Sequence, residues 1–439
     1  MNFKRSWDMA GKWKTMPFNQ CAELIKDTVH PSEVRGHPYV GLEHISEGQL
    51  SISKYGLADQ VTSIKLRFQK GDILFGKLRP YFRKVVIAPF DGVCSTDIWV
   101  VRSKPGIDQR YLFYWMASYE FIEESTRASE GTRMPRAQWE FVGRITKPIP
   151  PLKEQRAIAH ILGTLDDKIE LNRKMNETLE QMARALFKSW FVDFEPVRAK
   201  MEGKWKRGKS LPGMPAKLYD LFPNRLVNSE LGEIPEGWRV GKPTECCIKV
   251  YNGGTPRRNE NRFWNRGNIP WLTSGEVRKP IIIITENYIT EEGLAESSAK
   301  WVPPFSTVVA LYGATAGQVS LTALRLTTNQ AVCALIPKKS FAFFNYHTMR
   351  LATGELTNKA VGSAQQNISK KIIEDTKLVL PSDTVVNIFN EMVTPFFVQW
   401  ISNLHQSRTL AALRDALLPK LISGEIRIKD AERFLRRRV

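Results

Sequence analysis

The residues that come nearest to a catalytic motif are 203–210, with the sequence GKWKRGKS. They match the pattern GxxxxGK[ST] of phosphate-binding loops, in which backbone N–H groups and a lysine surround the phosphates of a nucleotide. Such a loop needs a buried strand before it and a helix after it, because these elements aim the N–H groups at the phosphates. RAKME precedes the motif and LPGMP follows it, so neither flank fits. We therefore expect no nucleotide site here.

Other catalytic signatures are incomplete. Asn268, Ile269, Pro270 and Trp271 are similar to the Asn-Pro-Pro-aromatic motif of amino-methyltransferases, but Ile269 stands where that motif needs proline. No glycine-rich loop for S-adenosylmethionine precedes them. The six histidines are scattered, without the spacing of metal ligands. We expect a chain with no catalytic residues, no bound metal and no cofactor of its own.

The charge of the chain favours a binding function instead. Its 439 residues carry a net charge of +19 at pH 7. Such an excess of Lys and Arg indicates a polyanionic partner, and nucleic acid is the first candidate. Five cysteines without a CxxC pair argue against a disulfide framework and a zinc site. The chain shows neither the apolar core of a signal peptide nor a membrane-length apolar run, so we expect a cytoplasmic protein.

The sequence contains an internal repeat, with residues 1–191 and 232–422 as two copies of one unit. Each copy has an extended segment, a strand ending in glycine, a second strand and a polar turn led by glycine. The corresponding segments are HPYVGLEHI and NIPWLTSGEV, GDILFG and STVVALYG, STDIWVV and TNQAVCALI, and GTRMPR and GSAQQN. Alternating apolar residues in these strands favour half-buried antiparallel sheet. The repeat therefore predicts two globular α+β domains.

Each copy closes with a segment that predicts a long helix, residues 151–193 and 382–424. Apolar residues recur there at spacings of three and four, as in the seam of a coiled coil. A helix from Lys153 to Trp190 would be about 57 Å long, which exceeds the core of one small domain, so the two helices are expected to pack together. The predicted seam consists of Ile158, Ile161, Leu165, Met175, Leu179, Met182 and Leu186 in the first helix, and Phe389, Met392, Phe396, Gln406, Leu410, Leu413 and Leu417 in the second.

Two asparagines, Asn172 and Asn403, occupy equivalent positions on these helices. A polar residue inside an apolar seam lowers stability but fixes the register of the helices. The alternative is that both side chains face solvent at the edge of the seam. We include both among the residues that pack the helix pair.

The segment between the copies, residues 194–231, is polar, basic and rich in Gly and Pro. We interpret it as an exposed, partly flexible connector, and the alternative is a connector that lies near DNA phosphates. The basic tail, residues 425–439, either pairs with the N-terminal segment or extends into solvent.

Two long stretches of the chain resemble the DNA specificity subunit of type I restriction–modification systems. They are PIPPLKEQRAIAHILGTLDDKIELNRKMNETLEQMARALFKSWFVDFEPV at 148–196 and LYDLFPNRLVNSELGEIPEGWRV at 218–240. The layout of a variable domain followed by a long helix, twice over, is similar too. The second helix opens with LPSDTVVNIF where the first has PPLKEQRAIA, so we expect the subunit contacts at the two ends to differ.

The resemblance implies a non-catalytic adaptor that reads a split, asymmetric DNA target, one half with each domain. Its two long helices would pack as an antiparallel coiled coil with pseudo-twofold symmetry and set the length of the spacer. They would dock two modification subunits, which hold S-adenosylmethionine and methylate adenine, and restriction subunits, which use ATP and Mg to translocate and cut DNA. Twofold docking on B-DNA would put the half-site centres ~10 base pairs apart.

The resulting division of the chain has six parts. They are a first target-recognition domain at 1–150, a spacer helix at 151–193, the basic linker at 194–231, a second target-recognition domain at 232–381, a second spacer helix at 382–424 and the tail at 425–439. The residues expected to pack the helix pair are Ile158, Leu165, Asn172, Leu179, Leu186, Phe389, Phe396, Asn403, Leu410 and Leu417.

The predicted DNA contacts are side chains in turns that follow strands. Arg and Lys can read guanine or grip phosphate, and Gln and Asn can pair with adenine. In the first copy they are Lys77, Arg79, Tyr81, Arg83, Lys84, Arg133 and Arg136. In the second copy they are Arg257, Arg258, Tyr312, Thr315, Gln318, Ser363, Gln365, Gln366 and Asn367. The alternative for these turns is a solvated hairpin.

Two other classes of function stay open. A fused methyltransferase–specificity enzyme would need a cofactor loop and an intact catalytic tetrapeptide. A structural or RNA-binding protein with a coiled-coil spacer would prefer RNA or ignore DNA sequence.

Overall fold

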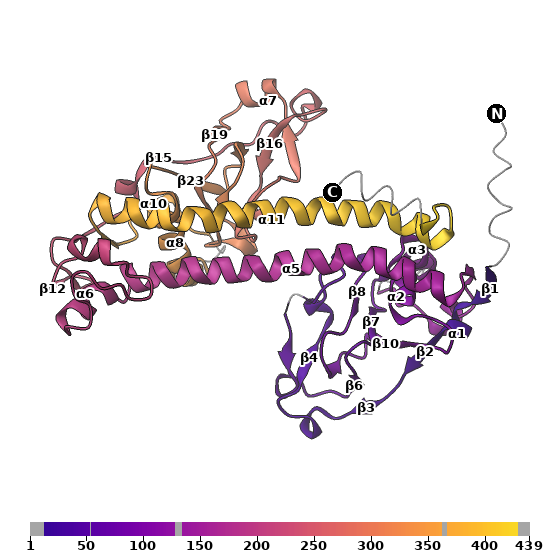
Figure 1. Cartoon of the computed structure of the whole chain (residues 1–439). Helices are drawn as coiled ribbons and strands as arrows, with labels where there is room; N and C mark the ends of the chain where they lie inside the picture. Colours follow the sequence, from indigo (N-terminus) through magenta and orange to yellow (C-terminus); the bar gives the residue numbers. More distant parts are fainter. Residues whose placement is uncertain (1–12, 53, 128–133, 362–366, 429–439) are drawn as a thin grey trace. The chain divides into compact units, whose positions relative to one another are not determined.

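The computed structural model describes residues 13–52, 54–127, 134–361 and 367–428, which form two compact units (Figure 1). Unit 1 runs up to Leu171 and resumes at Gln406, and unit 2 is Asn172–His405. The division falls inside two long helices, α5 (Leu152–Phe191) and α11 (Asp383–Ser423). Each helix therefore gives one segment to each unit.

Two sheets form the body of unit 1. One is antiparallel, in the order β2-β10-β7-β8, from β2 (Ala22–Ile25), β10 (Ile98–Ser103), β7 (Ile73–Gly76) and β8 (Val85–Ile87). The other has the order β3-β6-β9-β4-β5, from β3 (Thr28–Val29), β6 (Lys65–Phe68), β9 (Gly92–Cys94), β4 (Pro38–Val40) and β5 (Gly56–Leu57). The remaining elements are β1 (Lys14–Pro17) paired with β11 (Thr146–Ile149), and the helices α1 (Phe18–Cys21), α2 (Gln109–Ala117), α3 (Tyr119–Arg127) and α4 (Trp139–Val142).

Unit 2 is built in the same way. Its first sheet has the order β15-β23-β20-β21-β17, from β15 (Cys247–Asn252), β23 (Val332–Pro337), β20 (Thr307–Ala310), β21 (Val319–Thr322) and β17 (Ile281–Ile282). Its second has the order β18-β16-β22-β19, from β18 (Asn287–Ile289), β16 (Ile269–Leu272), β22 (Leu326–Thr328) and β19 (Trp301–Val302). The rest are β12 (Leu226–Ser229) with β13 (Gly232–Pro235), β14 (Arg239–Gly241) with β24 (Leu378–Leu380), and α6 (Glu195–Met201), α7 (Glu291–Ala295), α8 (Ala342–Leu351), α9 (Thr353–Val361) and α10 (Lys370–Glu374).

The strand pairings confirm the internal repeat of an α+β domain. The order β2-β10-β7-β8 of unit 1 recurs as β15-β23-β20-β21 in unit 2. The parallel pair β4–β9 recurs as β16–β22. Because parallel pairs occur beside antiparallel ones, both second sheets are mixed, which the strand patterns did not predict.

The prediction of half-buried strands is wrong, because the central strands are buried on both faces. In β7, Ile73 and Phe75 join a cluster with Leu112 of α2, whereas Leu74 faces Val40 of the second sheet. Unit 2 repeats this arrangement, with alternate residues of β20 in two different clusters. Helices cover one face of each central sheet and the second sheet covers the other.

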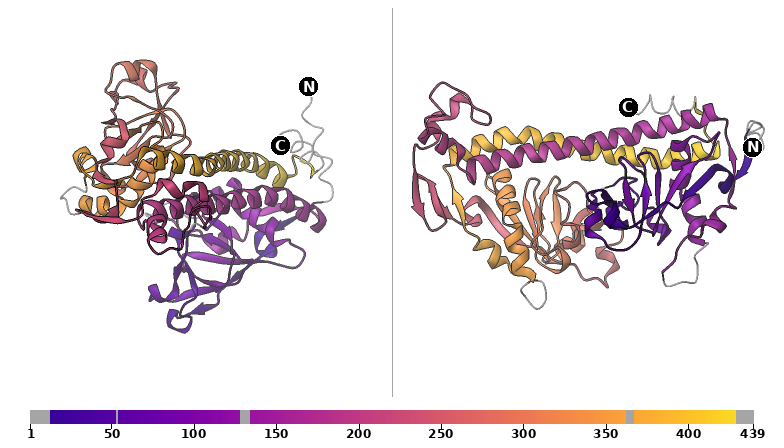
Figure 2. Two further views of the ribbon diagram at one scale, coloured as in Figure 1. Left: turned by 60° about the vertical axis from the view of Figure 1, so that its left-hand side comes forward. Right: turned by 90° about the horizontal axis from the view of Figure 1, so that it is seen from below.

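Within each unit, the segments of α5 and α11 lie side by side (Figure 2). In unit 1, Asp166 of α5 pairs with Arg414 of α11 at 2.6 Å. Twelve residues earlier on α5, Glu154 pairs with Arg427, just beyond the end of α11, at 3.1 Å. Residue numbers rise along one partner as they fall along the other, so the two segments are antiparallel.

The pairing in unit 2 is antiparallel as well. The rings of Phe187 and Phe389 pack with centroids 5.9 Å apart, and the side-chain amide of Asn403 donates to Asn176 at 2.9 Å. The Asn172 amide donates to the carbonyl of Asn403 at 3.4 Å. Asn172 and Asn403 are 0% and 4% exposed. Both asparagines therefore lie inside the seam and not at its solvent edge.

One column of seam residues recurs every seven positions and faces the helix pair or the adjoining core. Its buried or partly buried members are Ile158, Leu165, Asn172, Leu179 and Leu186 of α5, and Phe389, Phe396, Asn403, Leu410 and Leu417 of α11. A column at this spacing is what a heptad helix pair requires.

The second column agrees with the sequence pattern at Ile161, Met392 and Leu413, which are buried or partly buried, but lies one residue later in the middle of α5. Three residues assigned to it are exposed instead, namely Met175, Met182 and Gln406. On α5 the buried residues are instead Asn176 and Ala183. They lie on the same helix face as the buried Trp190, at intervals of seven residues. The rotation of α5 follows from its C-terminal aromatic residues, whose burial in the core of unit 2 removes more apolar surface from water than two methionines would.

The segment between the repeats is largely exposed, as predicted, but it also contains helix α6 and buried side chains. Trp205 is 1% exposed, and its indole N–H donates to the carbonyl of Lys209 at 2.8 Å. The indole of Trp190 donates to the carbonyl of Gly213 at 3.0 Å. The spacing that mimics a phosphate-binding loop is thus a turn wrapped around a buried tryptophan.

The core of unit 2 contains a buried histidine, His347 of α8. Its ring stacks on Phe187 of α5 with centroids 5.2 Å apart and an angle of 24°. Burial, together with the charges of Arg350 and Arg184, lowers the pKa of His347 to about 3. The imidazole is therefore neutral in the folded chain at pH values where an unfolded chain would bind a proton.

We predict that this histidine makes folding sensitive to mild acid. An unfolded histidine titrates near pH ~6.5. Below that value the unfolded state binds a proton at this histidine and the folded state does not. Stability should fall by up to about 1.4 kcal/mol per pH unit between roughly 6.5 and 3. His347→Phe should give a shallower fall between pH 7 and 5 in denaturant unfolding. Equal slopes for both proteins would contradict this assignment.

Candidate nucleic-acid interface

The two predicted contact turns of the first copy are hydrogen-bonded to each other. The turn after β7 closes when Gly76 N–H donates to the carbonyl of Lys84 at 2.8 Å. Arg79 N–H then donates to Pro135 at 2.8 Å, and Ala137 N–H donates to Lys77 at 2.9 Å. We call residues 77–84 with 134–137 the first loop pair.

Unit 2 assembles the equivalent turns with equivalent hydrogen bonds. The turn after β20 closes through Ala310 N–H to Gln318 at 3.0 Å, and Ile368 N–H donates to Leu311 at 2.9 Å. Tyr312 and Asn367 form an antiparallel bridge, as Leu78 and Arg136 do in unit 1. We call residues 311–318 with 367–368 the second loop pair. The repeat therefore places the same two turns together in both units.

Both loop pairs use left-handed backbone at the same two positions. In the first these are Arg79 and Arg83, with φ of 52° and 50°, and in the second Gly313 and Gly317, with φ of 75° and 82°. Glycine adopts this conformation readily, whereas another residue is strained by on the order of 1 kcal/mol. The two arginines of the first loop pair thus occupy positions for which glycine is the unstrained choice.

The side chains predicted to contact DNA from the first loop pair fall into two groups. Arg79, Tyr81 and Arg136 are exposed, and Arg136 also pairs with Asp97 at 3.0 Å. Lys77 and Lys84 are half-buried, and the Lys84 ammonium donates to the carbonyl of Leu42 at 2.8 Å. Arg133 lies outside the described residues. The exposed group gives the first loop pair two guanidinium groups and one phenol that solvent can reach.

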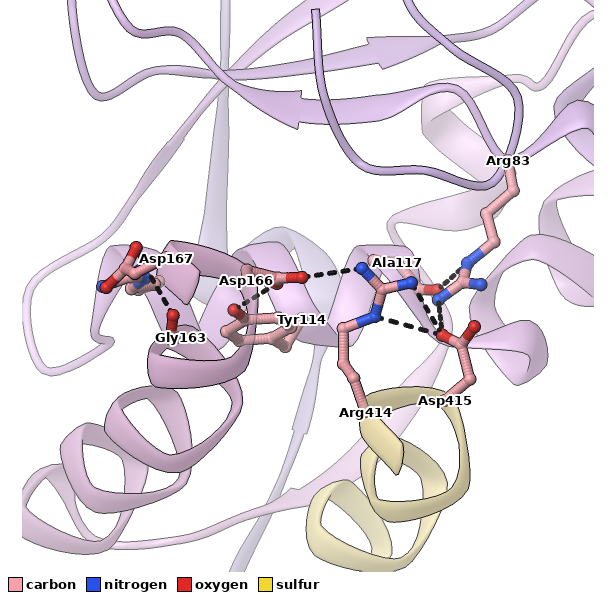
Figure 3. Close-up of polar contacts among 9 residues, drawn as sticks. Arg83, Tyr114, Ala117, Gly163, Asp166, Asp167, Arg414 and Asp415 are labelled. Atoms are coloured by element: carbon pink, nitrogen blue, oxygen red, sulfur yellow. Dashed lines mark hydrogen bonds and ion pairs between the residues drawn. The ribbon is translucent and has the colours of Figure 1, made fainter. Parts of the chain in front are cut away.

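Arg83 corrects the prediction, because its side chain points into the unit and not toward solvent. It is 4% exposed, and its Nε donates to the carbonyl of Ala117 at the end of α2 at 2.7 Å. Its Nη2 pairs with Asp415 of α11 at 3.1 Å (Figure 3). Its guanidinium lies 4.5 Å from the ring centre of Tyr119. All its polar contacts are internal, so Arg83 is not available to DNA in this structure.

The second loop pair presents a smaller and less basic surface. Tyr312 is exposed, and Gln318 and Asn367 are half-buried. Thr315 is a further correction, since it is 3% exposed and its hydroxyl donates to the carbonyl of Ser274 at 2.9 Å. Ser363, Gln365 and Gln366 lie outside the described residues.

The remaining predicted contacts, Arg257 and Arg258, are exposed in the turn after Gly254. The guanidinium of Arg258 lies over the rings of Trp264 and Trp271, at 4.3 and 4.8 Å from their centres. Trp271 is buried and donates its indole N–H to the carbonyl of Gly254 at 3.0 Å. Stacking on two indoles holds this arginine in place while one side of it stays exposed.

Sequence reasoning missed two exposed cations beside the second loop pair, Arg278 and Lys279. They follow the short turn that contains Ser274, which is bonded to Thr315, and the Lys279 carbonyl accepts from Ser320 of β21. Their only signal in the sequence was their position directly after the repeated extended segment. Tertiary hydrogen bonds place Arg278 and Lys279 near the second loop pair. The sequence pattern of the strands does not show these contacts.

The described residues offer little that resembles a catalytic site. No group of three His, Cys, Asp or Glu within them is close enough to hold a metal ion, and no helix there is long and apolar enough to cross a membrane. All five cysteines are free and buried, and burial raises the pKa of the Cys21 thiol to about 11. Trp271, the last residue of the incomplete methyltransferase tetrapeptide, is a buried strand residue.

Comparison with known proteins finds relatives that match most of the chain. The HindI type I restriction enzyme specificity subunit of Haemophilus influenzae is 29% identical over 406 residues, which is 82% of this chain and 88% of that one. The MjaIX specificity subunit of Methanocaldococcus jannaschii is 27% identical over 409 residues, or 92% and 87% of the two chains.

A solved structure shares the fold. The S subunit of a type I restriction–modification system from M. genitalium aligns with a TM-score of 0.56 at 14% identity, over 96% of this chain and 98% of that one. The model of the type I restriction modification DNA specificity domain matches residues 13–181 and 235–385, one stretch in each repeat. These stretches make up more than half of the sequence, and the chain belongs to the family of type I restriction–modification DNA specificity subunits.

Proposed function

We propose that this chain reads a bipartite, asymmetric DNA target and brings that target to the methylation and restriction subunits of a type I complex. The observation that carries the proposal is the loop pair, built by the same hydrogen bonds in both units of a strongly basic chain. Two turns held together on rigid strands form a surface that can enter a DNA groove and keep its shape.

The different chemistry of the two loop pairs supports an asymmetric target. The first offers Arg79 and Arg136, whose guanidinium groups suit guanine O6 and N7 or phosphate oxygens. The second offers the phenol of Tyr312 and the amides of Gln318 and Asn367, and these amides suit adenine N6 and N7. One scaffold with two sets of side chains would read two unlike half-sites.

Arg257 and Arg258 are assigned to phosphate contacts. Arg258 is held against two indoles, which fixes its position but leaves little freedom to search for base edges. Exposed Arg278 and Lys279 would extend the same basic surface toward the second loop pair. Such contacts set orientation and affinity, while the loop pairs set sequence preference.

The helix pair is proposed to set the spacer between the half-sites. The two helices have 40 and 41 residues and each contributes to both units. Each is about 60 Å long and stiffened by its antiparallel partner within each unit. Their length would fix the distance between the two recognition surfaces.

The partners are proposed to be two modification subunits and restriction subunits, acting on DNA in the cytoplasm. S-adenosylmethionine, ATP and Mg would belong to these partners, and this chain would bind none of them. Exposed apolar side chains on the long helices suit such docking, because a surface that stays apolar in a free chain usually meets a protein. They are Leu171, Met175, Met182 and Val398.

The direct test is co-expression with the modification subunit, followed by methylation-sensitive sequencing of the host genome. A single asymmetric bipartite motif, methylated on adenine in both halves and lost on deleting this chain, is the expected result. S-adenosylmethionine binding by the isolated chain would favour a fused enzyme instead. Preference for RNA, or no complex with a modification subunit, would favour a coiled-coil binding protein.

We predict that Arg79→Ala weakens recognition of one half-site and leaves the other unchanged. Losing one guanidinium contact to a base should lower affinity by about 10- to 100-fold, measured with DNA duplexes altered in one half at a time. Arg127→Ala is the matched control, because Arg127 is an exposed arginine of the same unit on α3, where it pairs with Glu123 and Glu124. Equal losses at both half-sites would contradict a base contact at Arg79.

We also predict that lengthening both helices lengthens the spacer. One heptad inserted after Leu171 in α5 and another after His405 in α11 keeps the seam in register. Seven residues add about 10 Å of helix, which is ~3 base pairs at 3.4 Å per step. Sequencing should then find the same two half-sites with the longer spacer. An unchanged spacer would rule out the helix pair as the ruler.

A further inference from the structure

Arg83 ties the first loop pair to the long helices through a chain of charged hydrogen bonds. It lies four residues after the exposed Arg79, in the same turn. Its Nε donates to the carbonyl of Ala117, and its Nη2 pairs with Asp415 of α11 at 3.1 Å. The turn that presents Arg79 is therefore fastened directly to a helix of the pair.

The connection continues from Asp415 across the helix pair (Figure 3). Arg414 is 2% exposed and pairs with Asp415 at 3.1 Å and with Asp166 of α5 at 2.6 Å. The hydroxyl of Tyr114 on α2 donates to the same Asp166 at 2.6 Å. We call Arg83, Asp415, Arg414, Asp166 and Tyr114 the loop-to-helix network. It joins the recognition turn, both long helices and α2 within unit 1.

The environment keeps Arg414 charged and Tyr114 protonated. Burial acts to lower the pKa of Arg414, but the carboxylates of Asp166 and Asp415 outweigh it and the pKa is raised. Burial and the nearby Asp166 carboxylate raise the pKa of Tyr114. The phenol therefore stays protonated and can donate its hydrogen bond to Asp166. Charge-assisted hydrogen bonds with little exposure to water are directional and strong, which suits a positioning role.

The second repeat has no such connection at the equivalent place. Gly317 takes the position of Arg83, and a Cβ there would lie 2.7 Å from the backbone nitrogen of Thr357 in α9. The backbone of the second loop pair thus packs against a helix of its own domain. At this position only the first repeat has a side chain that can reach the long helices, and Arg83 adopts a strained left-handed backbone there.

We propose that the Arg83–Asp415 ion pair is a positioning lock that holds the first loop pair at a fixed place on α11, and so confines the complex to one spacer length. Arg83 and Asp415 are positioning residues, since neither would touch DNA. The proposal rests on the function proposed above and adds that spacer fidelity depends on this contact as well as on helix length. Without the lock, the first loop pair would shift on the helix and accept neighbouring spacers.

The test uses the full chain co-expressed with its modification subunits, with methylation measured by sequencing at sites whose spacers differ from the native one by one base pair. Arg83→Gly introduces the residue of the second repeat and removes the left-handed strain. Asp415→Asn keeps the shape of the partner and removes its charge. Each should raise methylation at off-spacer sites, relative to native sites, by about tenfold, the factor that corresponds to one lost charge-assisted hydrogen bond.

Two comparisons separate the lock from a general loss of structure. The double variant Arg83→Gly with Asp415→Asn should relax the spacer no more than Asp415→Asn alone, because Arg83→Gly removes only an ion pair that Asp415→Asn has already broken. Arg79→Gly makes the same backbone change in the same turn but removes an exposed arginine outside the network. It should weaken the first half-site and leave the spacer preference unchanged.

Unaltered spacer preference in both single variants would overturn the lock, as would additive effects in the double variant. If Arg83→Gly fails to fold, as seen by a lowered unfolding temperature, the isosteric Asp415→Asn decides the question alone. Spacer relaxation by Arg79→Gly to the same extent would also overturn it, since the effect would then belong to the turn and not to the ion pair. Absence of any bipartite motif with the wild-type chain would instead refute the proposed function.

Discussion

Burial of the apolar faces of two very long helices is the constraint on which the rest of this chain depends. A helix of 40 residues has more apolar surface than a domain of about 130 residues can cover, so each helix is partnered by the other and by a domain core. That is why the compact units divide in the middle of α5 and α11. Each half-helix belongs to the domain against which it packs, and neither helix is a free-standing linker.

The two units meet this constraint with different chemistry. In unit 2 the helix segments are held by aromatic packing, in which Phe187, Phe191 and Phe389 pack on one another and on the side chains of α8. In unit 1 the helix segments also pack through leucines and isoleucines, but a buried arginine, Arg414, lies among them and is neutralised by Asp166 and Asp415. A buried ion pair contributes less stability than apolar packing but demands one geometry. The buried ion pairs of unit 1 thus lie where the turn after β7 meets the helices, whereas the buried amides of Asn172, Asn176 and Asn403 lie in the seam of unit 2.

The repeat shows which features of the two loop pairs are shared and which differ between the units. The backbone hydrogen bonds of the two loop pairs and their left-handed positions are shared, although the residues at these positions are arginine in one and glycine in the other. The scaffold therefore tolerates a complete change of side chains.

The sequence by itself determined the repeat, the two long helices and the family. These follow from local periodicity and from the correspondence between two copies, neither of which depends on distant contacts. It did not determine the second seam column in the middle of α5, the folded part of the linker or the burial of Arg83 and Thr315. The rotation of α5 was decided by the packing of its aromatic C-terminal end in unit 2. The burial of Arg83 was decided by its ion pair with Asp415, which lies 332 residues away in the sequence. A charged residue in a turn is exposed by default, and only the tertiary structure can bring it a partner strong enough to bury it.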